Sequence, residues 1–173
     1  MNLSYYGEMP YALPGQVSDT SRYNIDGACV FNPDASQPQF IACGVAVKVG
    51  AVDGDGVKDI KPISGAEATQ KPYGVAIRSH FATTTRGNEM IYTPGDGINV
   101  MTVGRVWMVA DKATLAGSFG DTVYINPQDG KCTEATTNSK ITTTWTYTGS
   151  KTTVKGATKA DDIYLLEVQL RQA

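Results

Sequence analysis

The chain has 173 residues, a formal net charge of −2 and a sequence pI near 5.3. A surface that coats nucleic acid is expected to be basic, so this balance argues against that function. No apolar run approaches the ~20 residues of a membrane helix, and residues 1–20 lack the basic start and apolar core of a secretory signal. The 18 glycines, and the short β-branched and aromatic runs between turn formers, indicate an all-β protein of one domain, or one domain plus an arm.

The first 24 residues sustain neither the period of a strand nor that of a helix. They carry apolar side chains among prolines and glycines: Tyr5, Tyr6, Tyr11, Leu13 and Tyr23. Because proline biases the residue before it toward extended backbone, we predict an extended arm over residues 1–24, followed by a single β domain over 25–173. Tyrosine suits contact surfaces, since it has a broad apolar ring and a polar tip. The alternative is an arm folded back on its own domain.

Short strands are predicted at 28–31, 40–49, 57–63 and 73–78. The run 40–49 has the best alternation in the chain, with apolar residues at every odd position from 41 to 49. The Asp-Gly-Asp-Gly sequence at 53–56 predicts a hairpin turn into the following strand. Residues 64–71 form a looser connection, and the polar residues 79–90 predict an exposed loop or hairpin tip.

The central prediction is a long strand over 98–110, entered through the Pro-Gly-Asp-Gly turn at 94–97. Its apolar side chains fall on both faces, so the strand belongs in the middle of a packed structure. Gly104 interrupts the alternation and predicts a kink or bulge there.

Beyond residue 110, strands are predicted at 123–125, 141–147 and 163–170. A single helical turn fits 112–115, a turn fits 126–130, and 149–159 is predicted to be flexible or hairpin-like. Eight to ten short strands with frequent turns are typical of an antiparallel β-sandwich or β-barrel with little helix.

The sequence contains no recognisable catalytic set, so we predict no catalytic, cofactor-binding or metal-binding residues and no enzymatic activity. A Ser-His-Asp arrangement at His80 would need a serine and an acid brought to it, and no local motif suggests one; Asp53 and Asp55 fail the calcium-loop pattern because position 57 is valine. The sequence leaves open a pair of carboxylates that the fold brings together for glycoside cleavage, because pairing in space is not visible in it. Trp107 and Trp145 lie in alternating strands, where a core or subunit-contact role is favoured over stacking on a sugar.

The three cysteines, Cys29, Cys43 and Cys132, cannot all pair within one chain, and their spacing matches neither a zinc site nor a redox motif. Because Cys29 and Cys43 lie in strand-like runs, we predict that these two are small buried hydrophobes, and that the chain folds in a reducing cytoplasm.

An ordered series of segments resembles the structural cement, or decoration, proteins of tailed bacteriophage capsids. The segments are 13–17, 44–47, 72–78, 92–96, 100–107, 120–124, a turn ending at 130, and the late Tyr-Leu-Leu-Glu-Val strand. The resemblance spans roughly residues 13–170, and the threonine-rich segment 133–153 matches least well.

The resemblance implies a non-enzymatic virion protein that folds in the host bacterium and binds the outer surface of the icosahedral capsid. Its expected partners are the major capsid protein and itself, as a homotrimer, with no nucleic acid, membrane or cofactor. Such proteins clamp neighbouring capsid subunits after expansion of the shell. The expected contact residues are Tyr5, Tyr6, Tyr11, Leu13, Arg22 and Tyr23.

Two other functions fit the same sequence. One is a carbohydrate-binding β module, which requires an exposed aromatic row near Trp145 beside carboxylates. The other is a head-fibre base, although no fibre-like repeat is present.

Overall fold

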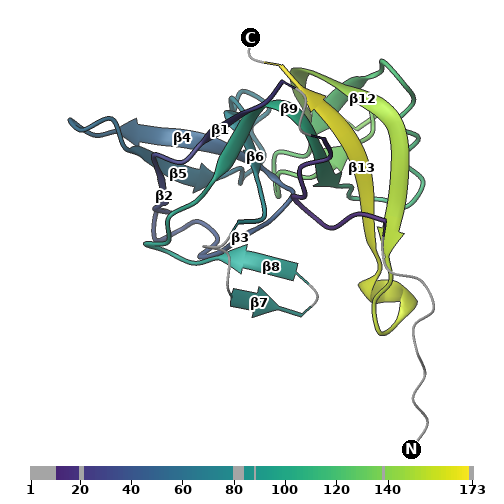
Figure 1. Ribbon diagram of the computed structural model, residues 1–173, viewed down its shortest axis with the longest axis horizontal. Coiled ribbons are helices and arrows are strands. Elements are labelled where there is room, and N and C mark those ends of the chain that lie inside the picture. The colour runs from purple at the N-terminus through teal and green to yellow at the C-terminus, as the bar shows by residue number, and fades with distance from the viewer. Residues whose placement is uncertain (1–10, 20–21, 80–83, 88, 138, 172–173) are drawn as a thin grey trace, which may run out of the picture.

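The computed structural model describes residues 11–19, 22–79, 84–87, 89–137 and 139–171 (Figure 1). Within these ranges the protein is all-β, as the sequence predicts. The strands are β1 (Asn24–Asp26), β2 (Cys29–Phe31), β3 (Ile41–Ala42), β4 (Ala46–Val52), β5 (Lys58–Pro62), β6 (Gly74–Ala76), β7 (Thr84–Arg86), β8 (Glu89–Tyr92), β9 (Val100–Val109), β10 (Thr122–Ile125), β11 (Cys132–Thr133), β12 (Ile141–Val154) and β13 (Ile163–Leu170). A single 3₁₀ turn, η1 (Lys159–Asp161), precedes β13.

Ten strands form one sheet in the order β11-β10-β12-β13-β9-β6-β4-β5-β2, with β1 also paired to β9. A second sheet has the order β3-β8-β7. The strand pairs are antiparallel except β2 and β5, which run parallel. In Figure 1, the long β12–β13 hairpin lies on one side of the molecule, and the β4–β5 hairpin projects from the other.

Strand β9 is the centre of the molecule, and its alternation changes phase at Gly104. Met101 lies in the same core cluster as Val106 and Met108, although its offset from Val106 along the strand is odd. A regular strand would place Met101 and Val106 on opposite faces. The phase shift confirms the predicted irregularity and explains how β9 is apolar on both faces.

Gly104 is also where the chain before β1 crosses β9. Its φ is +117°, and a Cβ added there would lie 2.8 Å from the Cβ and 3.2 Å from the Cα of Tyr23. Any other residue would therefore face both an unfavourable backbone conformation and a steric clash.

Buried side chains form three clusters that β9 joins. The largest contains Met101, Val106, Met108, Val123, Ile125, Ile141, Trp145, Tyr147, Val168 and Leu170. The second includes Phe31, Ile41, Val47, Ile60, Tyr92 and Val100. The third is small and consists of Ala12, Trp107, Val109, Ile163 and Leu165. Both faces of the central strand are thus covered, and residues before β1 contribute to covering one of them.

The structure differs from the sequence-based expectation in the bounds of two predicted strands, and β1 and β11 form where no strand is expected. The alternating run 40–49 is divided into β3 and β4 by a turn, although Ile41, Cys43 and Val47 still face one cluster. Strand β12 extends through Val154, well beyond the predicted end at residue 147. Its threonine-rich second half pairs with β13 from Lys151↔Leu166 to Val154↔Ile163, after a register shift between Tyr147 and Lys151. The 112–115 segment forms a single turn, closed by a hydrogen bond from Leu115 N–H to Lys112 C=O at 3.4 Å.

Candidate functional site

Residues 11–19, a part of the predicted arm, lie along β9, and we call them the N-terminal segment. The Gly15 N–H donates to Trp107 C=O at 2.9 Å, and the Trp107 N–H donates to Gln16 C=O at 3.0 Å. The Ser18 N–H donates to Arg105 C=O at 2.9 Å. These bonds hold the backbone of the segment against the central strand, and the segment is not extended throughout: a turn at Pro14 and Gly15 is closed by a hydrogen bond from the Gln16 N–H to Leu13 C=O at 3.0 Å.

Side chains hold the same segment at its far end. Glu167 of β13 is buried, and its carboxylate accepts hydrogen bonds from the hydroxyls of Ser18 and Thr148. Asp19 forms an ion pair with Arg105 at 3.4 Å. The buried carboxylate thus joins the N-terminal segment to the β12–β13 hairpin, and its own charge is solvated by hydroxyl donors rather than by water.

Three of the expected contact residues, Tyr11, Arg22 and Tyr23, have exposed side chains. Tyr11 is 77% exposed, and its ring meets Trp107 edge-to-face with centroids 5.7 Å apart. Tyr23 is 50% exposed, Arg22 is exposed, and Leu13 is half-buried. Tyr5 and Tyr6 lie outside the described residues. The structure therefore brings Tyr11 and Leu13 onto one fixed segment, with Arg22 and Tyr23 following where the chain reaches β1.

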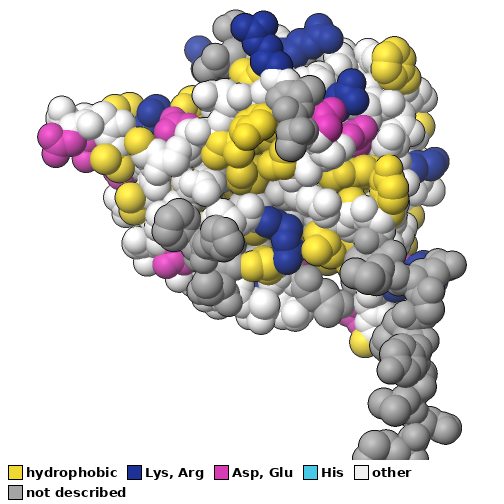
Figure 2. Space-filling model, in the orientation of Figure 1, with side chains coloured by type: hydrophobic (Ala, Val, Ile, Leu, Met, Phe, Trp, Pro, Cys, Tyr) yellow, Lys and Arg dark blue, Asp and Glu magenta, His cyan; other side chains and the backbone are white. Residues whose placement is uncertain are grey.

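Two other exposed apolar side chains were not singled out from the sequence. Phe119 is 84% exposed and Val52 is 56% exposed. Val52 stands near the end of the β4–β5 hairpin, which projects from the body and carries acidic side chains at its tip (Figure 2). In the sequence, Phe119 differs from its surroundings because it is a large apolar residue between Ser118 and Gly120, in a segment with no strand alternation.

Neither tryptophan offers a stacking surface. Trp107 is 3% exposed and Trp145 is 5% exposed, and both pack in core clusters. The core role that the alternation favoured for them is therefore confirmed, and the sugar platform expected near Trp145 is not formed by either ring.

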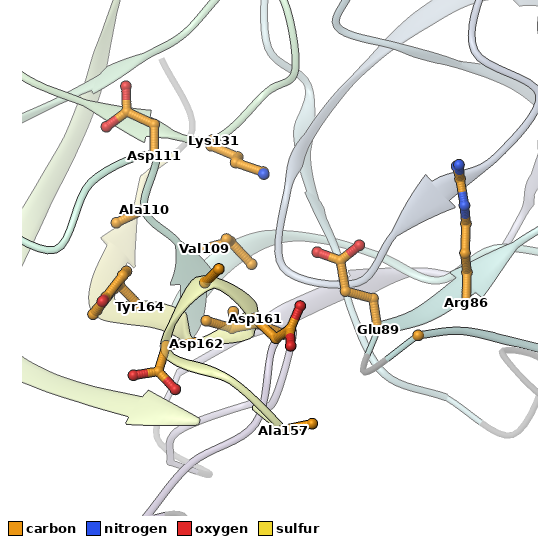
Figure 3. A pocket seen from close by; sticks show the side chains of 13 residues that line it. Arg86, Glu89, Val109, Ala110, Asp111, Lys131, Ala157, Asp161, Asp162 and Tyr164 are labelled. Atoms are coloured by element: carbon orange, nitrogen blue, oxygen red, sulfur yellow. The ribbon is translucent and has the colours of Figure 1, made fainter. Parts of the chain in front are cut away.

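A cleft of about 580 Å³ opens between the β7–β8 hairpin and the loop that joins β12 to β13 (Figure 3). Glu89, Asp161 and Lys131 direct their charged ends into it, whereas Asp111 turns away. Asp111 accepts a hydrogen bond from the Thr133 hydroxyl at 2.6 Å. Within the described ranges, no group of three or more His, Cys, Asp or Glu side chains is arranged to hold a metal ion. His80 lies outside these ranges.

All three cysteines are free and buried, as predicted for Cys29 and Cys43. Burial raises the pKa of Cys29, Cys43 and Cys132 to about 12 each. Since the thiolate is the reactive form, these thiols are poor nucleophiles at neutral pH.

Asp26 is a half-buried charged group held by two side chains next to the second core cluster. It accepts a hydrogen bond from the Tyr73 hydroxyl at 2.6 Å and pairs with Lys58 at 2.9 Å. Burial of the carboxyl acts to raise its pKa, but the hydrogen bonds from Tyr73, Lys58 and the Ala28 N–H outweigh it, so the pKa of Asp26 is lowered. This cluster joins β1, β5 and the residue before β6, and it has a structural role.

Comparison with known proteins gives a family for the whole chain. The family model described as structural cement protein (E217 gp24/Pam3 gp6) matches residues 1–171. The chain therefore belongs to the structural cement protein family, which places it among the structural proteins of the phage virion.

A solved structure described as "The capsid of Myoviridae Phage XM1" contains a chain of the same fold. The TM-score is 0.63 at 18% sequence identity, and the alignment covers 99% of this chain and 98% of that one. No significant match is found among curated proteins. In the part of the chain that the structure describes, no helix has the length and apolar character needed to cross a membrane.

Proposed function

We propose that this protein binds the outer surface of an expanded icosahedral phage capsid, as a homotrimer, and clamps neighbouring major capsid subunits. Family membership supports the association with a capsid. The observation that carries the finer proposal is the N-terminal segment, whose backbone is hydrogen-bonded to β9 while Tyr11 projects into solvent. Its backbone is already ordered before binding, so less conformational entropy is lost at the interface.

We propose further that residues 1–24 serve as the contact arm and 25–173 as the body that supports it. In this arrangement Tyr11, Leu13, Arg22 and Tyr23 lie at the base of the arm, and Tyr5 and Tyr6 are farther along it. Aromatic and arginine side chains dominate the energetics of protein interfaces, which supports this choice of residues.

The binding free energy of such a clamp comes from the surface area that each contact buries and from avidity. A specific contact typically buries ~800 Å² on each partner, and a trimer that holds several subunits gains avidity beyond any single contact. A protein that binds the assembled shell and not its loosened form stabilises it by ~2.7 kcal/mol per site at a hundredfold excess over Kd.

The proposed role is structural and non-enzymatic, and it suits a protein that folds in the host cytoplasm. Three buried thiols of raised pKa need neither oxidation nor a metal to be accommodated in the fold.

The arm is tested with Tyr11→Ala in the full chain. Because Tyr11 is largely exposed, this change leaves the body folded, and we expect the affinity for expanded, undecorated shells to fall by roughly tenfold, as for an interface anchor. Tyr11→Phe keeps the ring and is the matched control, with affinity close to wild type. Equal binding by Tyr11→Ala and wild type in a co-sedimentation titration would contradict the proposed role of Tyr11.

A further inference from the structure

Phe119 is the most exposed of the large apolar side chains that the structure describes, and its backbone is held in place. The Gly120 N–H donates to Tyr147 C=O at 2.9 Å, and the Tyr147 N–H donates to Asp121 C=O at 3.0 Å. The turn is closed by a hydrogen bond from the Asp121 N–H to Ser118 C=O at 3.1 Å. A turn fastened in this way to β12 holds the backbone of Phe119 in place and leaves its ring exposed to solvent.

The same turn borders an open hollow of about 690 Å³. Gly117 and Asp121, two residues on either side of Phe119, line it together with Leu115, Tyr124 and Tyr147. Leu115 and Tyr147 belong to the largest core cluster, so the floor of the hollow is continuous with the core. An exposed aromatic side chain beside a hollow lined with aromatic rings is typical of a protein interface, where aromatic anchor residues are concentrated.

The ionisable side chains that line this hollow are acidic, and the two lysines beside it, Lys112 and Lys140, already contact lining residues. Its lining contains two ionisable carboxylates, Asp121 and Glu134, and neither Lys nor Arg. Glu134 is paired with Lys112 at 3.3 Å, whereas Asp121 is exposed and its carboxylate has no hydrogen bond or ion pair within the described residues. Lys140 already covers the ring of Tyr124, 4.9 Å from its centroid, so an incoming cation is best placed at Asp121.

We propose that Phe119 and this hollow form a second contact with the shell, which takes an arginine- or lysine-bearing loop of a major capsid subunit. The inference rests on the proposed capsid function and adds a surface outside the N-terminal segment. The aliphatic part of the incoming side chain packs on Phe119 and the floor of the hollow, and its charged end pairs with Asp121.

The test is a binding titration of the full-length protein on expanded, undecorated shells. Phe119→Ala is expected to raise Kd by tenfold or more, since truncation of an exposed aromatic anchor removes most of its contact. Asp121→Asn is expected to raise Kd a few-fold at low salt and to reduce the salt dependence of binding. Val52→Ala is the matched control, because Val52 is an exposed apolar residue on a different hairpin; its Kd should equal that of wild type.

The outcomes separate this inference from the function on which it rests. If wild type does not bind shells at all, the capsid function fails. If wild type binds and Phe119→Ala binds equally well, only the second contact is refuted. The inference is also refuted if Phe119→Ala changes the self-association of the protein in sedimentation velocity while its affinity for shells is unchanged, because the hollow then accepts a second copy.

Discussion

At the scale of single residues, Gly104 has a geometric role that no side chain can replace. Its φ is +117°, and a Cβ at this position would come within 2.8 Å of the Tyr23 side chain, so both the backbone and the available space oppose substitution. Backbone strain of this kind costs on the order of 1–3 kcal/mol, so Gly104→Ala should lower the free energy of unfolding by at least that amount.

The measurement is urea unfolding followed by circular dichroism. Gly54→Ala is the matched control, because Gly54 lies at an exposed turn where an added Cβ meets no atom within 4 Å. Its effect should stay within about 0.5 kcal/mol of wild type. Equal stability of the two variants would contradict the assigned role of Gly104.

Asp26 gives a prediction about pH. Its folded-state pKa is lowered, whereas an unfolded aspartate has a pKa of about 3.9. The ionised carboxylate therefore stabilises the fold above about pH 4, and this stabilisation is lost as the pH falls through the folded-state pKa. Asp26→Asn should cost roughly 1.5–3 kcal/mol at pH 7, as expected for hydrogen bonds to a charged group, and less at pH 3.

The pH dependence is checked by measuring the free energy of unfolding of both proteins at the two pH values. Asp55→Asn, at the exposed tip of the β4–β5 hairpin, controls for the loss of one surface carboxylate. A difference between Asp26→Asn and wild type that is the same at pH 3 and pH 7 would show that the ionisation of Asp26 does not stabilise the fold.

At the scale of elements, the N-terminal segment is both part of the body and the base of the proposed arm. Deleting residues 2–10 removes none of the hydrogen bonds described for residues 11–19, so the thermal unfolding temperature should stay close to that of wild type. Deleting 2–19 removes the bonds to Arg105 and Trp107, the cover of Ala12 over Trp107, and the Ser18 donor to Glu167. At about 1 kcal/mol per net hydrogen bond, the loss should be several kcal/mol.

Differential scanning calorimetry of the two truncations distinguishes these cases. Glu167→Gln in the full chain is a useful companion, since it keeps the shape of the side chain and removes its charge. If deletion of 2–19 leaves the unfolding temperature unchanged, the segment is not an integral part of the body.

The strands could be predicted where local pattern determines them. The turn at 53–56, the long central strand with its break at Gly104, and the final strand at 163–170 follow from alternation and turn residues alone. The division of 40–49 and the extension of β12 to Val154 could not be predicted, because both depend on partners distant in sequence. β12 continues past residue 147 because β13 pairs with it, and its threonines do not specify that length.

The candidate contact surface could be predicted only in part. Tyrosines among prolines indicated contact residues near the N-terminus, but sequence alone left open whether residues 11–19 lie on the body. Those contacts depend on Trp107 and Glu167, about 90 and 150 residues farther along the chain. Phe119 carried almost no signal, because an isolated aromatic between small residues becomes notable only when its exposure is known.

At the scale of the whole molecule, the architecture suits a protein that contacts neighbouring subunits through its surface better than one that encloses a ligand. The central strand has packed cores on both faces. The most exposed apolar side chains instead stand on separate outer features: the N-terminal segment, the β4–β5 hairpin and the Phe119 turn. In the proposed clamp, contacts at the N-terminal segment and at the Phe119 turn allow one subunit to touch more than one neighbour.

The most direct test of this account is sedimentation of the purified wild-type protein with and without expanded, undecorated shells, together with its mass in solution. The account predicts saturable co-sedimentation, the mass of a trimer, and shells that withstand higher temperature when decorated. A protein that stays in the supernatant at all concentrations, and leaves the melting of the shells unchanged, would contradict it.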